Sequence, residues 1–352
     1  MTSALLCQAY LARRRRLLRW SWSAWLLALP LLWLAPAQAQ SPTPAACAAP
    51  QHTAVPPADM PDLRTQKTLQ ACDAEALYYG FGQRPDFSQA RQCAYLQRAK
   101  NDNSSGPFQG AAILSMIYAN GQGVPRNYPL ALKFACEAGG APAEVASRTQ
   151  HLATLARGTS QSEFDFCDDI TSGYMEGFCA QRDARFRNAK RSQQLGELIY
   201  HWSAAKRKAF GELQSAAQHF FEVRAEAEVD LSGSGRAAFE IEERGKLNDD
   251  FTAALDQFER GKLPAATQAE FARADQQLNA IYARALSVCS KAPQDGSVTA
   301  DGIRSSQRAW LLYRDAWVKF GSLAYPKVSA ISWQAWTTEQ RIRQLRDLAQ
   351  QN

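Results

Sequence analysis

The sequence lacks the short motifs that carry most enzyme chemistry. It has no His-Glu-x-x-His segment, no Gly-x-Ser-x-Gly elbow and no phosphate-binding glycine loop, and its four histidines are scattered. Its eight cysteines form no Cys-x-x-Cys pair, so zinc-ribbon and thioredoxin-like sites have no support. Carboxylate pairs such as Asp168-Asp169 lie near expected helix starts, where they suit the helix dipole. We therefore expect no enzyme activity, no metal and no cofactor.

The apolar run near the start, Trp25 to Leu34, has about ten residues, too few to cross a bilayer as a helix. Arginines precede it, and the small triplet Ala37-Gln38-Ala39 follows. This order predicts a cleaved signal peptide over residues 1–39, with a retained anchor as the alternative. The pattern Arg14-Arg15-x-Leu17-Leu18 leaves Sec and twin-arginine export both open. We expect an exported protein, periplasmic or secreted, with no stable membrane span after cleavage.

The basic charge of the chain belongs to this leader. It holds five arginines and no acidic residue, so its removal lowers the formal net charge from +6 to about +1. No later face clusters lysine and arginine with interleaved aromatic residues, as a nucleic-acid phosphate backbone would require. We expect a protein partner and no nucleic acid.

An internal repeat follows a stretch rich in proline and alanine. Residues 40–65 predict an extended linker. Residues 80–90 then align without a gap on residues 121–131, a period of 41 that superposes two Gly-x-Gly pairs. Small-residue helical stretches flank each glycine pair, so each unit is predicted to be a helical hairpin. The second unit carries the fuller pattern, Ala112-Ile113-Leu114-x-x-Ile117-Tyr118-x-x-Gly121-x-Gly123-Val124.

This pattern resembles the Sel-like repeats, relatives of the tetratricopeptide repeats, and we assign residues 66–158 to them. The resemblance implies protein binding or scaffolding. Cys72 and Cys93 lie about ten residues on either side of Gly82 and would face each other across the first hairpin, so we expect a disulfide there. The pairing of Cys47 and Cys136 stays open.

Three segments toward the C-terminal end carry a second family pattern. They are Ala274-Asp275-x-x-Leu278-Asn279-x-x-Tyr282, Arg304-x-x-Gln307-Arg308-Ala309-Trp310-Leu311-x-Tyr313-Arg314-Asp315-Ala316 and Glu339-Gln340-Arg341-x-x-x-Leu345. Together they resemble the LprI-type lysozyme inhibitors, and we assign residues 263–352 to such a domain. The resemblance implies an all-α protein that binds and blocks lysozyme.

Residues 163–262 look like a divergent first copy of the same domain. The copy opens with Cys167-x-x-x-Thr171-x-x-x-Met175-x-x-x-Cys179, similar to the cysteine pair that begins the family's domain, and we expect these cysteines to be bonded. Phe220 and Arg224 take the places of Trp310 and Arg314. The later copy lacks the opening pair, and Trp317 replaces the family's cysteine after Arg-Asp. We expect packing around that tryptophan to hold the motif together.

The helical spacing of the apolar motif residues predicts that they form part of the hydrophobic core. Trp310, Tyr313, Trp317 and Phe320 fall on one helix face, and Leu278, Ile281, Tyr282 and Ala285 form a matching stripe on the preceding helix. Cys289 continues the second stripe, so a buried free thiol is expected. Five polar motif residues either fix helix register or contact a partner; they are Asp275, Asn279, Arg308, Arg314 and Asp315. Gln307 is expected to be a structural residue of the motif.

Two turns between helices are candidate lysozyme-binding loops. The first, residues 222–244, is acidic around Gly233-Ser234-Gly235 and includes Glu226, Glu228 and Asp230; the second is residues 292–298. Acidic side chains would steer a basic enzyme toward them, although charged helix ends are commonly just solvated. The binding residues expected from both lines of argument are Glu226, Glu228, Asp230, Arg308, Arg314 and Asp315.

The predicted architecture is all-α: a short repeat array, then a bundle of about five or six helices. Helix ends are expected at residues 232–235, 261–264, 293–296 and 325–326. The function predicted is lysozyme inhibition. The alternative is a periplasmic Sel-like scaffold that joins envelope proteins, and a peptidoglycan hydrolase ranks third because no acid/base pair is evident.

Overall fold

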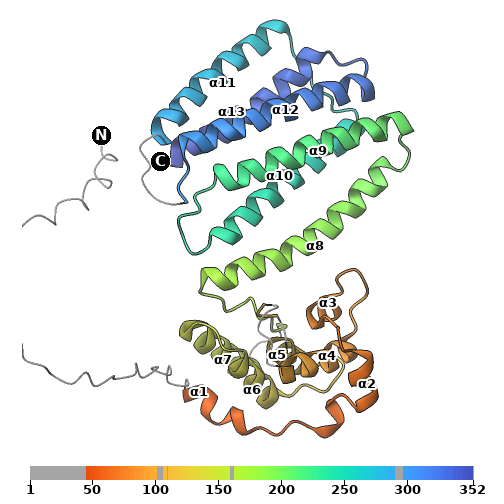
Figure 1. Ribbon diagram of the computed structural model, residues 1–352, viewed down its shortest axis with the longest axis vertical. Coiled ribbons are helices and arrows are strands. Elements are labelled where there is room, and N and C mark those ends of the chain that lie inside the picture. Colours follow the sequence, from red (N-terminus) through yellow and green to blue (C-terminus); the bar gives the residue numbers. More distant parts are fainter. Residues whose placement is uncertain (1–44, 101–105, 109, 159–161, 290–295, 352) are drawn as a thin grey trace, which may run out of the picture. The chain divides into compact units, whose positions relative to one another are not determined.

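The computed structural model describes residues 45–100, 106–108, 110–158, 162–289 and 296–351. All regular elements in these ranges are helices and none is a strand, which confirms the all-α prediction (Figure 1). No helix in the described ranges is long and apolar enough to span a membrane. The predicted signal peptide, residues 1–39, lies outside the described residues.

The 41-residue period is visible in the backbone of the repeat region. Its helices are α3 (Ala74–Tyr79), α4 (Phe87–Lys100), α5 (Ala111–Asn120), α6 (Tyr128–Ala138) and α7 (Pro142–Ala156). The hydrogen bond from Asp86 N to Leu77 O recurs from Asn127 N to Tyr118 O, both at 2.9 Å. The assignment of these hairpins to the Sel-like family stays a prediction.

Glycines end the first helix of each hairpin for a steric reason. Gly80 and Gly121 have φ of +77° and +70°. A Cβ atom would lie 2.6 Å from Pro85 in the first turn and 2.7 Å from Arg126 in the second. Only glycine adopts this left-handed conformation without strain and also leaves room for the returning chain.

Residues 45–65 of the segment predicted as an extended linker are instead docked on the repeats, and residues 40–44 lie outside the described ranges. It forms α1 (Ala45–Ala48), the short 3₁₀ turns Pro50–His52 and Pro57–Asp59, and α2 (Leu63–Thr68). Cys47 is bonded to Cys136 of α6, and Tyr118 donates a 2.8 Å hydrogen bond to Asp59. The linker prediction was wrong because proline and alanine content indicates only local backbone stiffness. It cannot predict a disulfide between cysteines that are 89 residues apart.

The cysteine pairs expected from the sequence are the ones that the structure joins. Cys72 is bonded to Cys93 and Cys167 to Cys179, each with Cα atoms 5.9 Å apart. Cys289 is the free cysteine of the described residues, and it is buried. Burial, and then the nearby carboxylate of Glu228, raise the pKa of this thiol, so it stays protonated and unreactive.

Thiol counting checks this pairing. The folded, signal-cleaved protein should expose no thiol to Ellman's reagent, and denaturation in guanidinium without reductant should release one, from Cys289. A Cys289→Ser variant should show none in either state. Two or more thiols in the denatured wild type would contradict the pairing.

Helix α8 (Gly173–Ile199) contributes to two hydrophobic cores. Met175 and Cys179, near its start, belong to the core of the repeats, while Leu195 and Leu198 pack against the core of the C-terminal helices. Phe164, before the helix, also lies in the first core. The change of composition near residue 163 therefore does not coincide with the change of core, and the predicted domain boundaries stay predictions.

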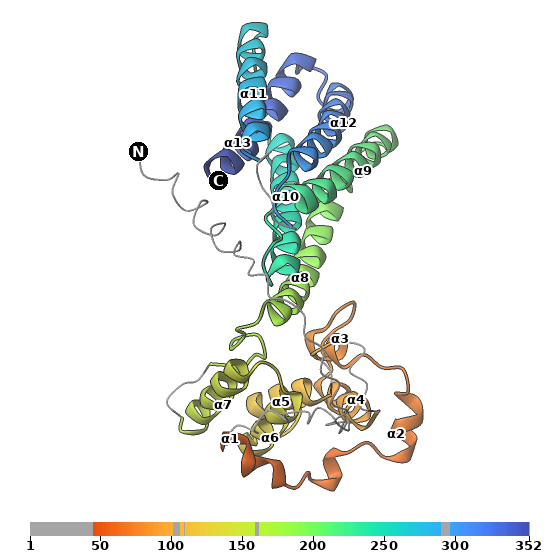
Figure 2. The ribbon, with the colours of Figure 1, turned by 60° about the vertical axis from the view of Figure 1, so that its left-hand side comes forward.

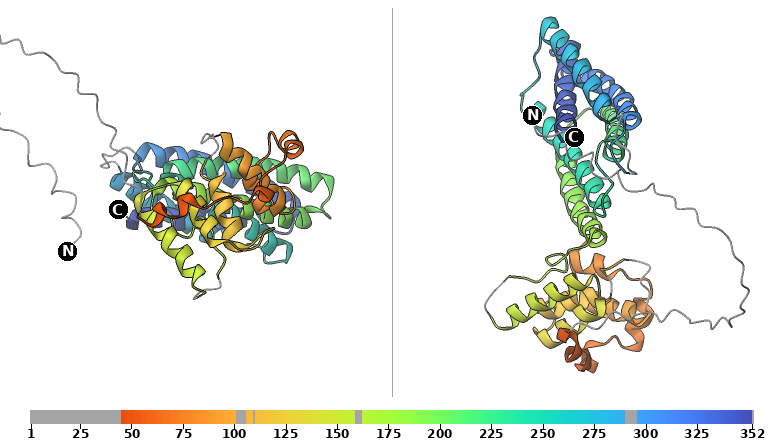
Figure 3. Two further views of the ribbon diagram at one scale, coloured as in Figure 1. Left: turned by 90° about the horizontal axis from the view of Figure 1, so that it is seen from below. Right: turned by 90° about the vertical axis from the view of Figure 1, so that its left-hand side faces the viewer.

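The C-terminal bundle pairs its helices in a regular way. Its other members are α9 (Ala204–Ala227), α10 (Arg236–Glu259), α11 (Gln268–Cys289), α12 (Ala300–Ala324) and α13 (Ala330–Gln351). Helix α8 packs along α10 and α11 along α13 (Figure 2), and the same pairs can be followed in the right-hand view of Figure 3. Helices α9 and α12 pack on each other across the middle.

Helices α9 and α12 run antiparallel. Ser306 near the start of α12 reaches the carbonyl of Val223 near the end of α9, at 3.5 Å. The ring of Phe320 lies 5.7 Å from that of Trp202, just before α9 begins. The α8–α10 pair and the α11–α13 pair thus meet through α9 and α12.

Candidate functional site

The aromatic residues of the C-terminal motif form the centre of the bundle core. Trp310, Tyr313, Trp317 and Phe320 are at most 5 % exposed. Their side chains meet the aromatic residues of α9 and α10, and Tyr313 stacks on Phe220 with ring centres 5.3 Å apart. The helical spacing of these four aromatic residues therefore correctly predicted that they lie in the core.

Trp317 of α12 lies where α10, α12 and α13 meet. Its ring stacks on that of Trp333 at 6.0 Å and 9°, and it contacts Phe258 edge-on at 5.7 Å. Trp333 approaches closely because Gly321 lacks a side chain: a Cβ there would lie 2.3 Å from the indole. Aromatic packing therefore holds the three helices together at this position, as expected from the sequence.

A buried ion-pair network joins α9 to α13. Arg341 donates two hydrogen bonds to Glu228, at 2.8 and 2.5 Å, and both side chains are fully buried. Gln307 of α12 accepts a third bond from Arg341, at 2.9 Å. Arg224 contacts Glu228 at 3.2 Å and also pairs with Glu243 of α10. Burial lowers the pKa of Arg224 to about 10, and the carboxylate of Glu228 opposes this.

The network corrects the role expected for Glu228. This residue was predicted to contact a partner, but it is the C-cap of α9 and its carboxylate turns inward to two arginines. The sequence suggested that Glu228 is exposed because its neighbouring residues are acidic. The partner that buries Glu228 is 113 residues away, so nothing local reports it.

A second cluster ties the opposite end of α9 to α10 and α12. Glu259 accepts hydrogen bonds from Trp202 at 3.1 Å, Lys206 at 2.6 Å and Tyr325 at 2.5 Å. Burial alone would raise the pKa of Glu259, but the bonds from Lys206, Tyr325 and Trp202 outweigh it, and the pKa lies below its ordinary value.

Because this pKa is lowered on folding, the carboxylate stabilises the native state above the unfolded-state pKa of about 4.3, and the contribution is lost as pH falls through the folded pKa. A Glu259→Gln variant should be less stable than the wild type by about 1–2 kcal/mol at pH 7. The difference in the free energy of unfolding between the wild type and the variant should decrease as the pH falls below about 4. Thermal melts across this range measure it, and a gap that stays constant with pH would contradict the assignment.

The outward face of α12 consists of residues that are exposed and do not pack in the core. Arg308, Leu311, Leu312 and Asp315 follow one another at helical spacing on the side opposite the aromatic stripe. Leu311 is 38 % and Leu312 61 % exposed. Arg308 and Asp315 were predicted from the sequence as partner-binding residues, whereas the two leucines were not. Their position opposite the aromatic stripe was the available signal.

Arg314 lies at the border of this face. Its guanidinium stands 5.3 Å over the ring of Trp310 and donates to Asp315 at 3.1 and 3.0 Å. On α11, Leu278 is buried, Tyr282 is half-buried, and Asn279 donates to Asp275 within the same helix at 3.3 Å. The hydrogen bonds of Asp315 and Asp275 thus stay within their own helices in the described chain.

Glu226 and Asp230 are exposed at the turn between α9 and α10. Hydrogen bonds from Ser232 lower the pKa of Asp230. Leu231 donates to the carbonyl of Gly296 at 2.7 Å, so the two loops predicted as separate candidates pack on each other; residues 292–295 of the second lie outside the described ranges. No hydrogen bond or ion pair in the described residues joins Glu226 or Asp230 to the α12 face.

Within the described ranges, no group of three or more histidine, cysteine, aspartate or glutamate side chains could hold a metal ion. Acidic side chains near the turn divide into two sets. Glu228, Glu240 and Glu243 are paired with arginines. Four are exposed: Glu222, Glu226, Asp230 and Glu242. The arrangement provides surfaces for a protein partner, one partly apolar on α12 and one acidic at the turn.

Comparison with curated proteins gives no match, and comparison with solved structures gives none. A protein-family model does match the chain over the last turns of α10, all of α11 and α12, and most of α13. The Sel-like repeats and the divergent first copy stay predictions beside it. Residues 254–345 match the model of the family described as lysozyme inhibitor LprI.

Proposed function

We propose that this chain is an exported inhibitor that binds lysozyme and blocks its active-site cleft. The observation that carries the proposal is the match of residues 254–345 to the lysozyme inhibitor LprI, in a segment whose most specific motif lies on α12. The inward half of that motif is accounted for by packing. The outward half, Arg308, Leu311, Leu312 and Asp315, has no such structural role and is available for a partner.

The outward face of α12 has the composition of a small binding surface. Two exposed leucines lie beside charged residues, as in interfaces with an apolar centre and a polar rim. The helix beneath is fixed by the tryptophan cluster and by the buried pair of Glu228 and Arg341. A rigid surface loses little conformational entropy on binding, which favours affinity.

The acidic turn adds steering. Vertebrate-type lysozymes are basic and work with two carboxyl groups in an open cleft. Glu222, Glu226, Asp230 and Glu242 are exposed on one stretch of α9, the turn and α10. Such a set speeds encounter with a basic partner and makes association sensitive to salt.

Two further features support parts of the proposal. The pairing of α8 with α10 parallels that of α11 with α13, as expected if residues 163–262 are a divergent first copy. Three disulfides in the described residues fit an oxidising compartment, in agreement with export.

Hydrolysis of a cell-wall suspension by a vertebrate-type lysozyme tests the function. Purified mature protein at micromolar excess should slow the fall in turbidity, and the effect should weaken with added salt. A Leu312→Asp variant should lose inhibition, whereas Leu323→Asp, a leucine of the same helix that is also exposed, should keep it.

An absence of inhibition at this excess would refute the proposal and leave the alternative, an envelope scaffold. The recurrence of the hydrogen bonds of the hairpin turns at a 41-residue period is the observation that favours it. Pull-down from an envelope extract with residues of the repeat region altered would then test the scaffold directly.

A further inference from the structure

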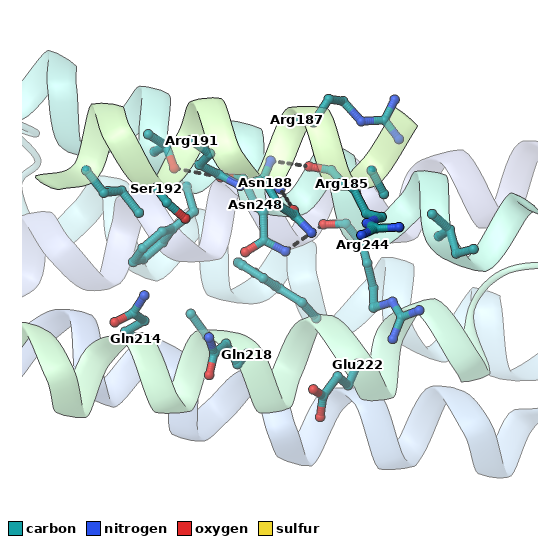
Figure 4. A pocket seen from close by; sticks show the side chains of 18 of the residues that line it. Arg185, Arg187, Asn188, Arg191, Ser192, Gln214, Gln218, Glu222, Arg244 and Asn248 are labelled. Atoms are coloured by element: carbon teal, nitrogen blue, oxygen red, sulfur yellow. Dashed lines mark hydrogen bonds between the residues drawn. The ribbon is translucent and has the colours of Figure 1, made fainter. Parts of the chain in front are cut away.

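A cleft between α8, α9 and α10 lies outside the segment matched to the inhibitor family. Its volume is about 640 Å³, within the range of small-molecule sites. The buried rings of Phe221 and Phe251 form part of its wall. Figure 4 shows Gln214, Gln218 and Glu222 on α9, across the cleft from Asn188, Arg191 and Asn248 on α8 and α10.

Most charged groups at the cleft are already neutralised. Arg185 pairs with Glu75 at 3.2 Å, Arg244 with Glu240 at 3.2 Å, and Arg191 with Asp249. A ligand carrying several phosphates would need several unpaired cations, so the cleft does not suit a polyanion.

Carboxamides are the largest polar class in the lining. They are Gln181, Asn188, Gln214, Gln218 and Asn248. Gln214 and Gln218 are one helical turn apart on α9, and neither has a hydrogen-bond partner among the described residues. A carboxamide offers both a donor and an acceptor, which suits hydroxyl groups, since each of these also donates and accepts.

Arg187 is the arginine of the lining with an unused binding edge. Its Nε and Nη2 atoms are shielded from solvent and have no hydrogen-bond partner in the described residues. Its guanidinium lies against Gly245, where a Cβ would stand 3.4 Å from Nη2. In the repeat region, Arg98 uses the same two nitrogens to bind the carboxylate of Glu137, at 2.5 and 3.0 Å.

We propose that this cleft binds a carboxylate-bearing saccharide. The Nε–Nη2 edge of Arg187 takes the carboxylate through two parallel hydrogen bonds. The free carboxamides of Gln214 and Gln218 bind sugar hydroxyls, and Phe221 and Phe251 supply apolar contact to the C–H surface of the ring. Arg187 must turn for this edge to meet the ligand, because the structure shields both nitrogens from solvent. The site shares Glu222 with the acidic steering set and shares no residue with the outward face of α12.

Isothermal titration calorimetry of the full mature chain tests the site with single sugars. The probes are N-acetylmuramic acid and glucuronic acid, which carry a carboxylate, N-acetylglucosamine, which is neutral, and glucose 6-phosphate. The carboxylate sugars should bind with a Kd near or below about 1 mM, and the neutral sugar at least about tenfold more weakly.

Variants separate the proposed contact from general charge. Arg187→Gln should weaken binding of the carboxylate sugars at least about tenfold, and Arg187→Lys should not restore it, because lysine cannot form the two-bond contact. Gln218→Ala should weaken binding by about threefold to tenfold. Arg260→Gln should have no effect, since Arg260 is exposed, pairs with Asp256 and lies outside the cleft.

Three results would overturn the proposal. They are no binding of either carboxylate sugar at about 10 mM, binding that Arg187→Gln leaves unchanged, and equal or tighter binding of glucose 6-phosphate. Circular dichroism of each variant ensures that any loss reflects the site, and not unfolding.

Discussion

Replacing Arg341 with methionine should lower the free energy of unfolding by about 3–5 kcal/mol, the cost of leaving one member of a buried ion pair without its partner. Glu228 would keep only Arg224, at 3.2 Å, and would lose the two hydrogen bonds that satisfy its carboxylate. Gln307 would also lose its donor. Urea denaturation followed by circular dichroism measures the change.

The paired variant and a surface control make this result specific. The double variant Glu228→Leu/Arg341→Met removes both buried charges and should recover part of the loss, because two apolar side chains leave no uncompensated charge. Lys246→Met breaks an exposed pair with Asp250 and should cost less than about 1 kcal/mol. A cost below about 1 kcal/mol for Arg341→Met would show that the network is not buried in solution.

Replacing Trp317 with alanine should cost about 3–5 kcal/mol. The indole is fully buried and stacks on Trp333, so its loss opens a cavity where three helices meet. Trp317→Phe should cost less because it keeps an aromatic ring there. Thermal unfolding monitored by near-UV circular dichroism reports the loss of both stability and aromatic packing.

Tyr200→Ala is the matched control, since Tyr200 is 75 % exposed, and it should change stability by no more than about 0.5 kcal/mol. If Trp317→Ala cost as little as Tyr200→Ala, the motif would be held by something other than the tryptophan cluster.

Local and periodic features of this fold were predictable from the sequence. The glycine turns recur because positive φ at Gly80 and Gly121 leaves little other choice. Cys72 and Cys93 pair because one hairpin brings them to the same height. The break between α8 and α9 was missed, since it contains no glycine or proline; Ser203, whose side chain accepts from Lys206 N at 3.2 Å, was the available signal.

Contacts between residues far apart in the sequence could not be predicted from the sequence. The Cys47–Cys136 disulfide ties residues 45–68 to the repeats, and an odd set of cysteines gave no reason to choose that pair. The exposure of Glu228 was misjudged because Arg341 reaches it from another helix. Helical spacing predicts which residues of a helix are buried. It does not predict which distant residue pairs with a buried polar side chain, because that depends on how several helices pack together.

The affinity of the full mature chain for a vertebrate-type lysozyme, measured by biolayer interferometry, tests most directly whether α12 carries the inhibitory face. The wild type should bind with a Kd below about 1 μM. Leu312→Asp should weaken binding at least about tenfold, and Leu323→Asp should leave it unchanged. No binding by the wild type, or equal effects of the two substitutions, would contradict the assignment of this face.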